Sequence, residues 1–148
     1  MQDDSSSPNK KAPTGLSPAQ LYALGVGVIM ALAGIVGMLT NASFGRGINI
    51  DVSTLIVFDL NGWLDIVHLA TGLVGLYVAR SLKASRVFAI VVGSVYGVLT
   101  VWGLFDNAIL GLLPINDADT ILHATIAALG ITAAFAPDDS GSLGARVR

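Results

Sequence analysis

One stretch without any charged residue, residues 16–45, restricts what this chain can fold into more than any other feature. Each residue adds about 1.5 Å to a helix, so about 20 apolar residues cross a hydrocarbon core of about 30 Å. Residues 21–40 meet this requirement. The stretch therefore predicts a first membrane-spanning helix.

A cleaved signal peptide is the alternative interpretation of this segment. Lys10 and Lys11 precede the apolar run, and residues 31–33 (ALA) resemble a cleavage site. The run continues beyond them through Ile35 to Leu39, whereas the apolar region of a signal peptide has only about 7–15 residues. A retained membrane helix is the favoured interpretation.

Three further apolar segments follow, and charged residues or proline bound them. They are residues 62–79, 87–105 and 117–136. Apolar residues make up 53% of the chain and charged residues 12%, which is about half the charged fraction of an average soluble protein. So few charges cannot cover a water-facing surface. We therefore predict an all-α, four-helix transmembrane bundle whose outer surface contacts the lipid bilayer.

The membrane domain is predicted to comprise residues 18–137. Residues 1–17 and 138–148 are polar and are predicted to be disordered cytoplasmic tails. Residues 41–59 mix charged and apolar side chains. This mixture predicts an outer loop that lies on the membrane surface or enters the bundle.

Basic residues are segregated along the chain. Seven of the eight Lys and Arg residues fall on one side of the predicted membrane, and one, Arg46, falls on the other. The seven are Lys10, Lys11, Arg80, Lys83, Arg86, Arg146 and Arg148. Because the excess of basic residues in a membrane protein faces the cytoplasm, both termini are predicted to be cytoplasmic.

The four segments form two similar units. An offset of 66 residues aligns the first segment with the third, and an offset of 55 aligns the second with the fourth. Matched pairs are Gly27 with Gly93, Gly37 with Gly103, Asn61 with Asn116, and His68 with His123. We therefore predict tandem repeats over residues 18–81 and 84–137, related by a pseudo-two-fold axis along the membrane normal.

Two sets of residues are predicted to have structural roles. Asn61 and Asn116 precede the second and fourth segments, where an Asn N-cap satisfies a free backbone N–H. Small residues spaced four apart let membrane helices approach closely. The glycines predicted to act in this way are Gly27, Gly37, Gly93, Gly97 and Gly103.

The candidate polar site consists of His68, His123 and Asp65. The two histidines are the only ones in the chain, and their matched positions predict a common depth below the outer surface. Asp65 precedes His68 by three residues on one helix face, where a carboxylate can orient the imidazole or favour its protonation. Thr120 takes the place of Asp65 in the second unit. Interhelical hydrogen bonding by neutral histidines is the structural alternative.

No resident metal or cofactor is predicted. The chain has no Cys, which excludes thiolate metal sites. Haem b held axially by His68 and His123 is the alternative, and a metal site of the two histidines with Asp65 would lack ligands. The net charge of −2 gives no reason to expect nucleic acid. No phosphate-binding glycine loop or hydrolase motif occurs.

Two segments resemble the signature of a bacterial membrane family known as domain of unknown function 4383. They are residues 58–69 (FDLNGWLDIVHL) and residues 110–116 (LGLLPIN), the latter followed by ILH at 121–123. The second copy departs from the first after the histidine. The resemblance covers roughly residues 18–136 and implies a four-helix protein of the bacterial plasma membrane, with no known activity.

Three functions are open at this point. The favoured one is a non-enzymatic membrane component that acts as an accessory subunit to a membrane partner or self-associates as a homo-oligomer. A haem-binding or proton-handling protein that uses the histidine pair is the second. A small transporter subunit is the third, for which the two-unit symmetry is suggestive.

Overall fold

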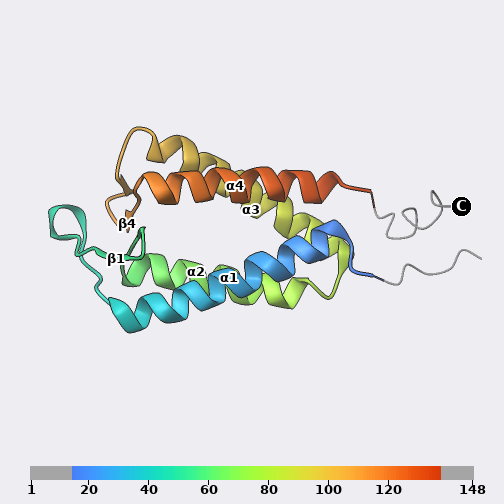
Figure 1. Cartoon of the computed structure of the whole chain (residues 1–148), viewed down its shortest axis with the longest axis horizontal. Helices are drawn as coiled ribbons and strands as arrows, with labels where there is room; N and C mark the ends of the chain where they lie inside the picture. Colours follow the sequence, from blue (N-terminus) through green and yellow to red (C-terminus); the bar gives the residue numbers. More distant parts are fainter. Residues whose placement is uncertain (1–14, 138–148) are drawn as a thin grey trace, which may run out of the picture.

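The computed structural model describes residues 15–137, which form a four-helix bundle with two short β-hairpins (Figure 1). The predicted all-α, four-helix fold class is confirmed. The rest of the predicted tails, with Lys10, Lys11, Arg146 and Arg148, lies outside the described residues. The helices are α1 (Pro18–Thr40), α2 (Gly62–Val78), α3 (Leu82–Gly103) and α4 (Asp117–Phe135).

One β-hairpin joins the two helices within each half of the chain. The first pairs β1 (Ser53–Leu55) with β2 (Phe58–Leu60), and the second pairs β3 (Ala108–Ile109) with β4 (Leu113–Pro114); both are antiparallel. A short 3-10 helix, Gly47–Asn49, precedes the first hairpin. The outer loop predicted over residues 41–59 is therefore largely ordered into this 3-10 turn and hairpin.

Each of the four α-helices begins next to a side chain that caps it. Ser17, Asn61, Ser81 and Asn116 each accept a hydrogen bond from the backbone N–H three residues ahead. Ser17 is buried and forms a capping box with Gln20. The first helix therefore begins at Pro18 rather than at residue 21, and Ser17, which the sequence pattern assigned to the tail, is part of its cap.

The third helix also begins earlier than its apolar pattern indicates. It starts at Leu82 instead of residue 87, so Lys83 and Arg86 lie in its first turns rather than in a loop. The connection from α2 is only residues 79–81. The long aliphatic stems of Lys and Arg let their charges reach water from a helix end, which explains why charge did not mark the boundary.

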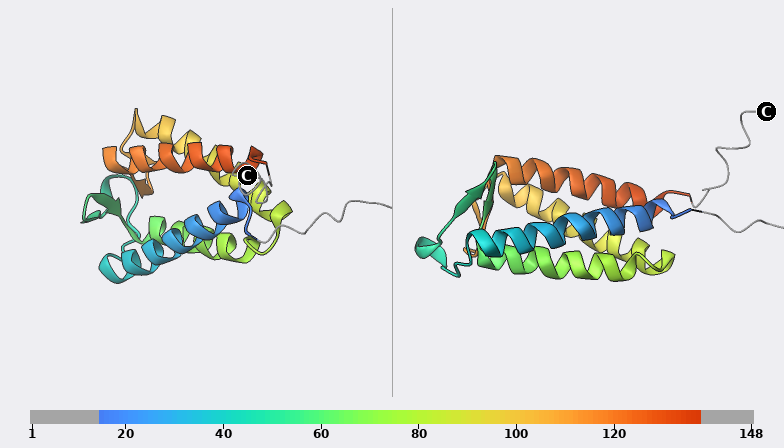
Figure 2. Two further views of the ribbon diagram at one scale, coloured as in Figure 1. Left: turned by 45° about the vertical axis from the view of Figure 1, so that its right-hand side comes forward. Right: turned by 60° about the horizontal axis from the view of Figure 1, so that its bottom comes forward.

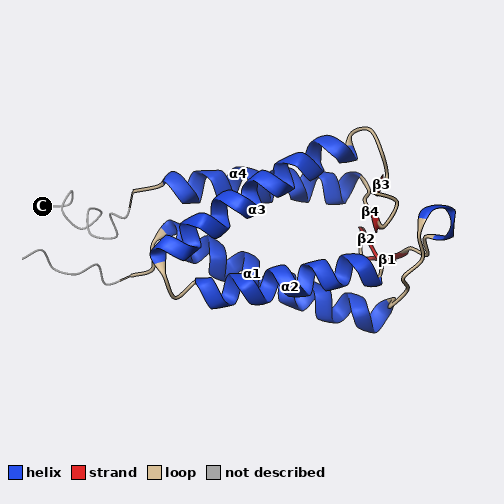
Figure 3. Ribbon diagram, turned by 180° about the vertical axis from the view of Figure 1, so that it is seen from behind, coloured by secondary structure: helices blue, strands red, loops and turns tan. Residues whose placement is uncertain are grey.

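The helices pack as two pairs, α1 with α2 and α3 with α4, which Figures 1 and 2 show as two layers. Both hairpins lie at one end of the bundle. The α2–α3 connection, the start of α1 and the end of α4 lie at the other end (Figure 3). Tyr22 and Phe88 pack against one another between the layers, with ring centroids 6.4 Å apart. The Tyr22 hydroxyl donates to the Ile126 carbonyl at 3.0 Å.

Large apolar side chains cover the outside of the bundle. Leu39 is 83% exposed and Tyr77 is 73% exposed, and exposed Leu, Ile, Val and Phe occur on all four helices. Soluble monomers rarely expose apolar patches of such extent. Three helices, α1, α3 and α4, are long and apolar enough to cross a membrane. The fold is thus that expected of a membrane protein.

Helix α2 is shorter than the other three. This apolar helix has 17 residues, which extend over about 25 Å, slightly less than a hydrocarbon core of about 30 Å. Its N-cap, Asn61, follows β2 directly, and Gly62 N–H donates to the Ser43 carbonyl at 2.8 Å. The hairpin and this connection therefore extend the α1–α2 unit beyond the end of α2.

Candidate functional site

The two capping asparagines connect the two helix pairs to one another. Asn61 accepts from Leu64 N–H at 3.0 Å, and its side-chain amide donates to the Leu112 carbonyl in the second hairpin at 2.8 Å. Asn116 accepts from Asp119 N–H at 3.0 Å, and its amide donates to the Val57 carbonyl in the first hairpin at 2.9 Å. Each asparagine thus caps its own helix and binds the hairpin of the other pair.

The hairpin turns correspond in the same way. Val57 and Leu112 both lie four residues before a capping asparagine, so the offset of 55 relates the acceptors as well as the donors. Ile56 and Gly111 are related by the same offset, and both have a left-handed backbone, with φ of 63° and 65°. Glycine adopts this conformation freely, whereas a β-branched residue rarely does.

Close helix contacts in the two pairs involve equivalent glycines. A Cβ atom at Gly27 would lie 2.8 Å from the backbone N of Leu76, and one at Gly93 would lie 3.1 Å from that of Ile131. Gly97 differs, because a Cβ atom there would meet only the Ala127 side chain, at 3.9 Å. The predicted packing role of Gly97 therefore does not apply inside the bundle.

A second equivalent glycine pair accommodates the polar side chain of the facing helix. The Asp65 carboxyl group lies directly against Gly37, and the Thr120 hydroxyl lies directly against Gly103. The hydroxyl of Thr120 donates to the Asn116 carbonyl at 3.0 Å. In both units a side chain larger than glycine on the first helix would occupy the space of the polar group.

Two partly enclosed cavities lie beneath the hairpins. The acidic cavity, about 150 Å³, has Asp59, Asp65, His68 and Asp119 in its wall. The neutral cavity, about 170 Å³, has His68, His123, Tyr96 and apolar side chains in its wall. His68 belongs to both walls and separates the two cavities. The structure therefore brings both predicted histidines to the neutral cavity and brings Asp65 to the acidic one.

His123 is buried without a polar partner for one of its ring nitrogens. It is 6% exposed, and its Nδ1 has no hydrogen-bond partner among residues 15–137. Its ring packs edge-on against Tyr96, with centroids 4.9 Å apart. The Tyr96 hydroxyl is directed at the Met30 sulfur, 3.4 Å away. An interhelical hydrogen bond through Nδ1, the structural role considered for this residue, is therefore not formed within the described chain.

Asp65 is the most deeply buried acidic residue in the described part of the chain. It is 1% exposed, and its Oδ2 atom has no hydrogen-bond partner there. No hydrogen bond joins it to His68 within the described residues. The spacing of three residues does place both side chains in the wall of one cavity, so they share a site without a hydrogen bond between them.

The geometry sets limits on the metal or cofactor that the histidines could hold. No group of three or more His, Asp or Glu side chains within residues 15–137 is arranged to hold a metal ion. The neutral cavity that contains both histidines, at about 170 Å³, is smaller than ligand pockets of about 300–1,000 Å³. A haem would require the helices around His68 and His123 to separate.

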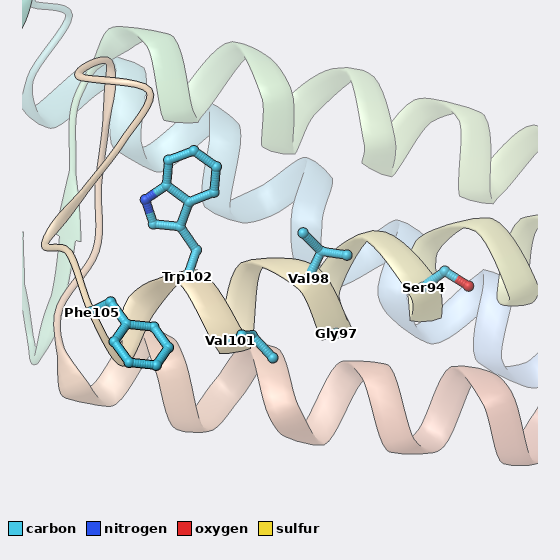
Figure 4. A pocket seen from close by; sticks show the side chains of 6 residues that line it. All are labelled: Ser94, Gly97, Val98, Val101, Trp102 and Phe105. Atoms are coloured by element: carbon cyan, nitrogen blue, oxygen red, sulfur yellow. The ribbon is translucent and has the colours of Figure 1, made fainter.

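The bundle also carries an open, shallow apolar groove on its outside. Figure 4 shows its lining residues, which come from α3 except Phe105, two residues after the end of that helix. They are Ser94, Gly97, Val98, Val101, Trp102 and Phe105, around a volume of about 660 Å³. Their spacing places them along one face of the helix, and the open position of Gly97 deepens the middle of the groove.

Residues 20–136 match the family described as a domain of unknown function, DUF4383. The chain belongs to this family. The match extends from the first turn of α1 to the residue after α4, so it includes both hairpins, both capping asparagines and both cavities. No curated protein and no solved structure matches the chain.

Proposed function

We propose that this DUF4383 protein is a multi-pass protein of the bacterial plasma membrane, with four spans and both termini in the cytoplasm. The distribution of described charges supports this orientation. Arg80, Lys83 and Arg86 lie at the end with the α2–α3 connection, and the cytoplasmic side of a membrane protein carries the excess of such residues. The hairpin end carries Arg46 and the acidic residues Asp51, Asp59, Asp106, Asp117 and Asp119.

The two helix pairs are proposed to be tandem copies of one unit. The reciprocal bonds from Asn61 to Leu112 and from Asn116 to Val57 support this origin. A single offset of 55 residues relates both donors and both acceptors. Two hairpins of unrelated origin are not expected to share such an offset. The two units then have the same topology, related by a pseudo-two-fold axis along the membrane normal.

The proposed function is association within the membrane rather than catalysis. The observation that carries this proposal is the apolar groove along α3. Lipid is as apolar as the groove, so association in a membrane depends on close packing against small residues. Gly97 supplies such a residue near its middle, and Ser94 supplies one at its end. We propose that the occupant is α3 of a second copy of this chain, which makes the protein a homo-oligomer.

Fluorescence energy transfer between labelled copies in lipid vesicles tests this proposal. Gly97→Leu fills the groove and is expected to abolish transfer. Gly25→Leu is the matched control, because Gly25 lies on α1 with nothing within 4 Å of its Cβ position. The proposal fails if the two variants associate equally. If the wild-type protein is a monomer but purifies with another membrane protein that Gly97→Leu releases, the accessory role replaces self-association.

A second candidate function, in proton or haem chemistry, is favoured by one observation. His123 is buried with Nδ1 unpartnered in the described chain, and ionisable residues within membrane spans are functional candidates. A Soret absorption band that disappears in His68→Ala and in His123→Ala would establish haem binding. A pH-dependent signal that both variants abolish while the fold stays intact would establish proton handling. The transporter alternative has only the two-unit symmetry in its support.

A further inference from the structure

The acidic and neutral cavities occupy equivalent places in the two helix pairs. The offsets of 55 and 66 relate His68 to His123, Phe58 to Leu113 and Met30 to Tyr96. In each pair, the first residue lines the acidic cavity and the second lines the neutral one. The residues of the neutral cavity therefore show which side chains satisfy the packing at each equivalent position of the acidic cavity.

The two cavities differ at three carboxylates. Asp59, Asp65 and Asp119 correspond to Pro114, Thr120 and Leu64, respectively. Pro114 and Leu64 line the neutral cavity, and Thr120 lies against Gly103 as Asp65 lies against Gly37. Uncharged residues thus satisfy the same packing around the neutral cavity. The acidic side chains around the other cavity, Asp59 and Asp65 from the first unit and Asp119 from the second, need an explanation other than packing.

Two of the three carboxylates have partners within the protein. Asp119 Oδ2 accepts from the backbone N–H groups of Asp59 at 3.2 Å and Asn116 at 3.1 Å. Asp59 Oδ1 accepts from the Thr54 hydroxyl at 3.0 Å. Asp65 Oδ2 has no partner among the described residues. No Lys or Arg lines the acidic cavity. An ionised carboxylate buried without a counter-charge is strongly disfavoured. Asp65 is therefore neutralised by a proton, by a protonated His68 in the same wall, or by a cation from outside the chain.

The geometry limits the kind of cation that can supply this charge. The side chains within residues 15–137 form no metal-binding group, and divalent cations need several oxygen or nitrogen ligands. The remaining wall is mostly apolar, with Ile29, Ala33 and Leu122. A monovalent cation with a short apolar body complements a single free carboxylate in such a wall. We infer that the acidic cavity binds a small alkylammonium cation, with the ammonium group against Asp65 and the alkyl group against these apolar side chains.

This inference is independent of the groove on α3 and of oligomerisation. Calorimetric titration of the full chain in lipid nanodiscs with ethylammonium chloride tests it. Ethanol serves as the neutral ligand of similar size, and sodium chloride controls for ionic strength. The wild-type protein is expected to bind ethylammonium and to show no binding of ethanol or sodium. A charge-assisted contact predicts that Asp65→Thr weakens binding about 10- to 100-fold.

Two further variants keep the test decisive. Asp51→Asn removes an exposed carboxylate from the hairpin end and is expected to bind like the wild type. If Asp65→Thr does not fold, Ala33→Phe fills the cavity while Asp65 is retained, and binding is expected to disappear. The inference is overturned if ethylammonium does not bind the wild type, which would leave a proton as the sole counter-charge. It is also overturned if ethanol binds equally or if Asp65→Thr binds as tightly as the wild type.

Discussion

Replacement of Asn61 by serine separates its two roles in the structure. A serine hydroxyl can still cap α2 by accepting from Leu64 N–H, but it cannot reach the Leu112 carbonyl as the asparagine amide does at 2.8 Å. Asn61 is 0% exposed and its bond to Leu112 is partly buried, so the carbonyl loses its partner where water has limited access. We expect Asn61→Ser to lower the free energy of unfolding by about 1–3 kcal/mol.

The equivalent substitution at Asn116 is expected to have a smaller effect. Asn116 is only partly buried, and its bond to the Val57 carbonyl lies at an exposed position, where water replaces the lost donor. We expect Asn116→Ser to cost about 0.5–1.5 kcal/mol. Asn61→Ala also removes the cap and should cost about 1 kcal/mol more than Asn61→Ser.

Reversible unfolding by dodecyl sulfate in mixed micelles, followed by circular dichroism, measures these differences. The expected order of destabilisation is Asn61→Ala, then Asn61→Ser, then Asn116→Ser. A wild-type stability for Asn61→Ser would show that the bond between the helix pairs contributes nothing. A larger cost for Asn116→Ser than for Asn61→Ser would refute the dependence on burial.

Two other substitutions test the packing and the turn geometry by the same unfolding measurement. Gly27→Ala brings a Cβ atom to 2.8 Å from the Leu76 backbone N and should lower the free energy of unfolding by about 1–3 kcal/mol. The control Gly25→Ala meets nothing within 4 Å and should not destabilise the protein. Equal effects of the two substitutions would contradict the packing. Ile56 is a β-branched residue with a left-handed backbone, and it is 87% exposed. Ile56→Gly removes the steric cost of that conformation and should stabilise the protein by about 1 kcal/mol. A loss of stability would show that the Ile56 side chain contributes more than its backbone conformation costs.

Local sequence signals were sufficient for the helices and for their asparagine caps. Apolar length marked the four helices, and Asn at a segment boundary indicated an N-cap. The same signals placed the start of α1 at residue 21 from its apolar residues and the start of α3 at residue 87 from charge, and they did not use Ser17 and Ser81 as caps. The hairpins were not predicted, since strands of two or three residues leave almost no periodic pattern.

The surroundings of the candidate site depended on tertiary contacts that spacing along one helix does not report. The interval between Asp65 and His68 suggested a direct pair, whereas α1 places Gly37 against the carboxyl group. The sequence alignment of the two units could have indicated this contact. Gly37 aligns with Gly103 and Asp65 aligns with Thr120, so a glycine opposite a polar residue recurs in both units. Gly97 shows the converse case, since a small residue at GxxxG spacing can face outward.

The membrane topology can be measured directly because the chain contains no native Cys. A thiol can be placed at three exposed positions in the single variants Asn49→Cys, Ser81→Cys and Asn107→Cys. Asn49 and Asn107 lie in the two loops between paired helices, and Ser81 lies in the α2–α3 connection. With a membrane-impermeant maleimide on intact cells, we predict labelling at residues 49 and 107, and labelling at 81 only after permeabilisation. Labelling at 49 and 81 from the same side would show that α2 does not cross the membrane and would contradict the four-span topology.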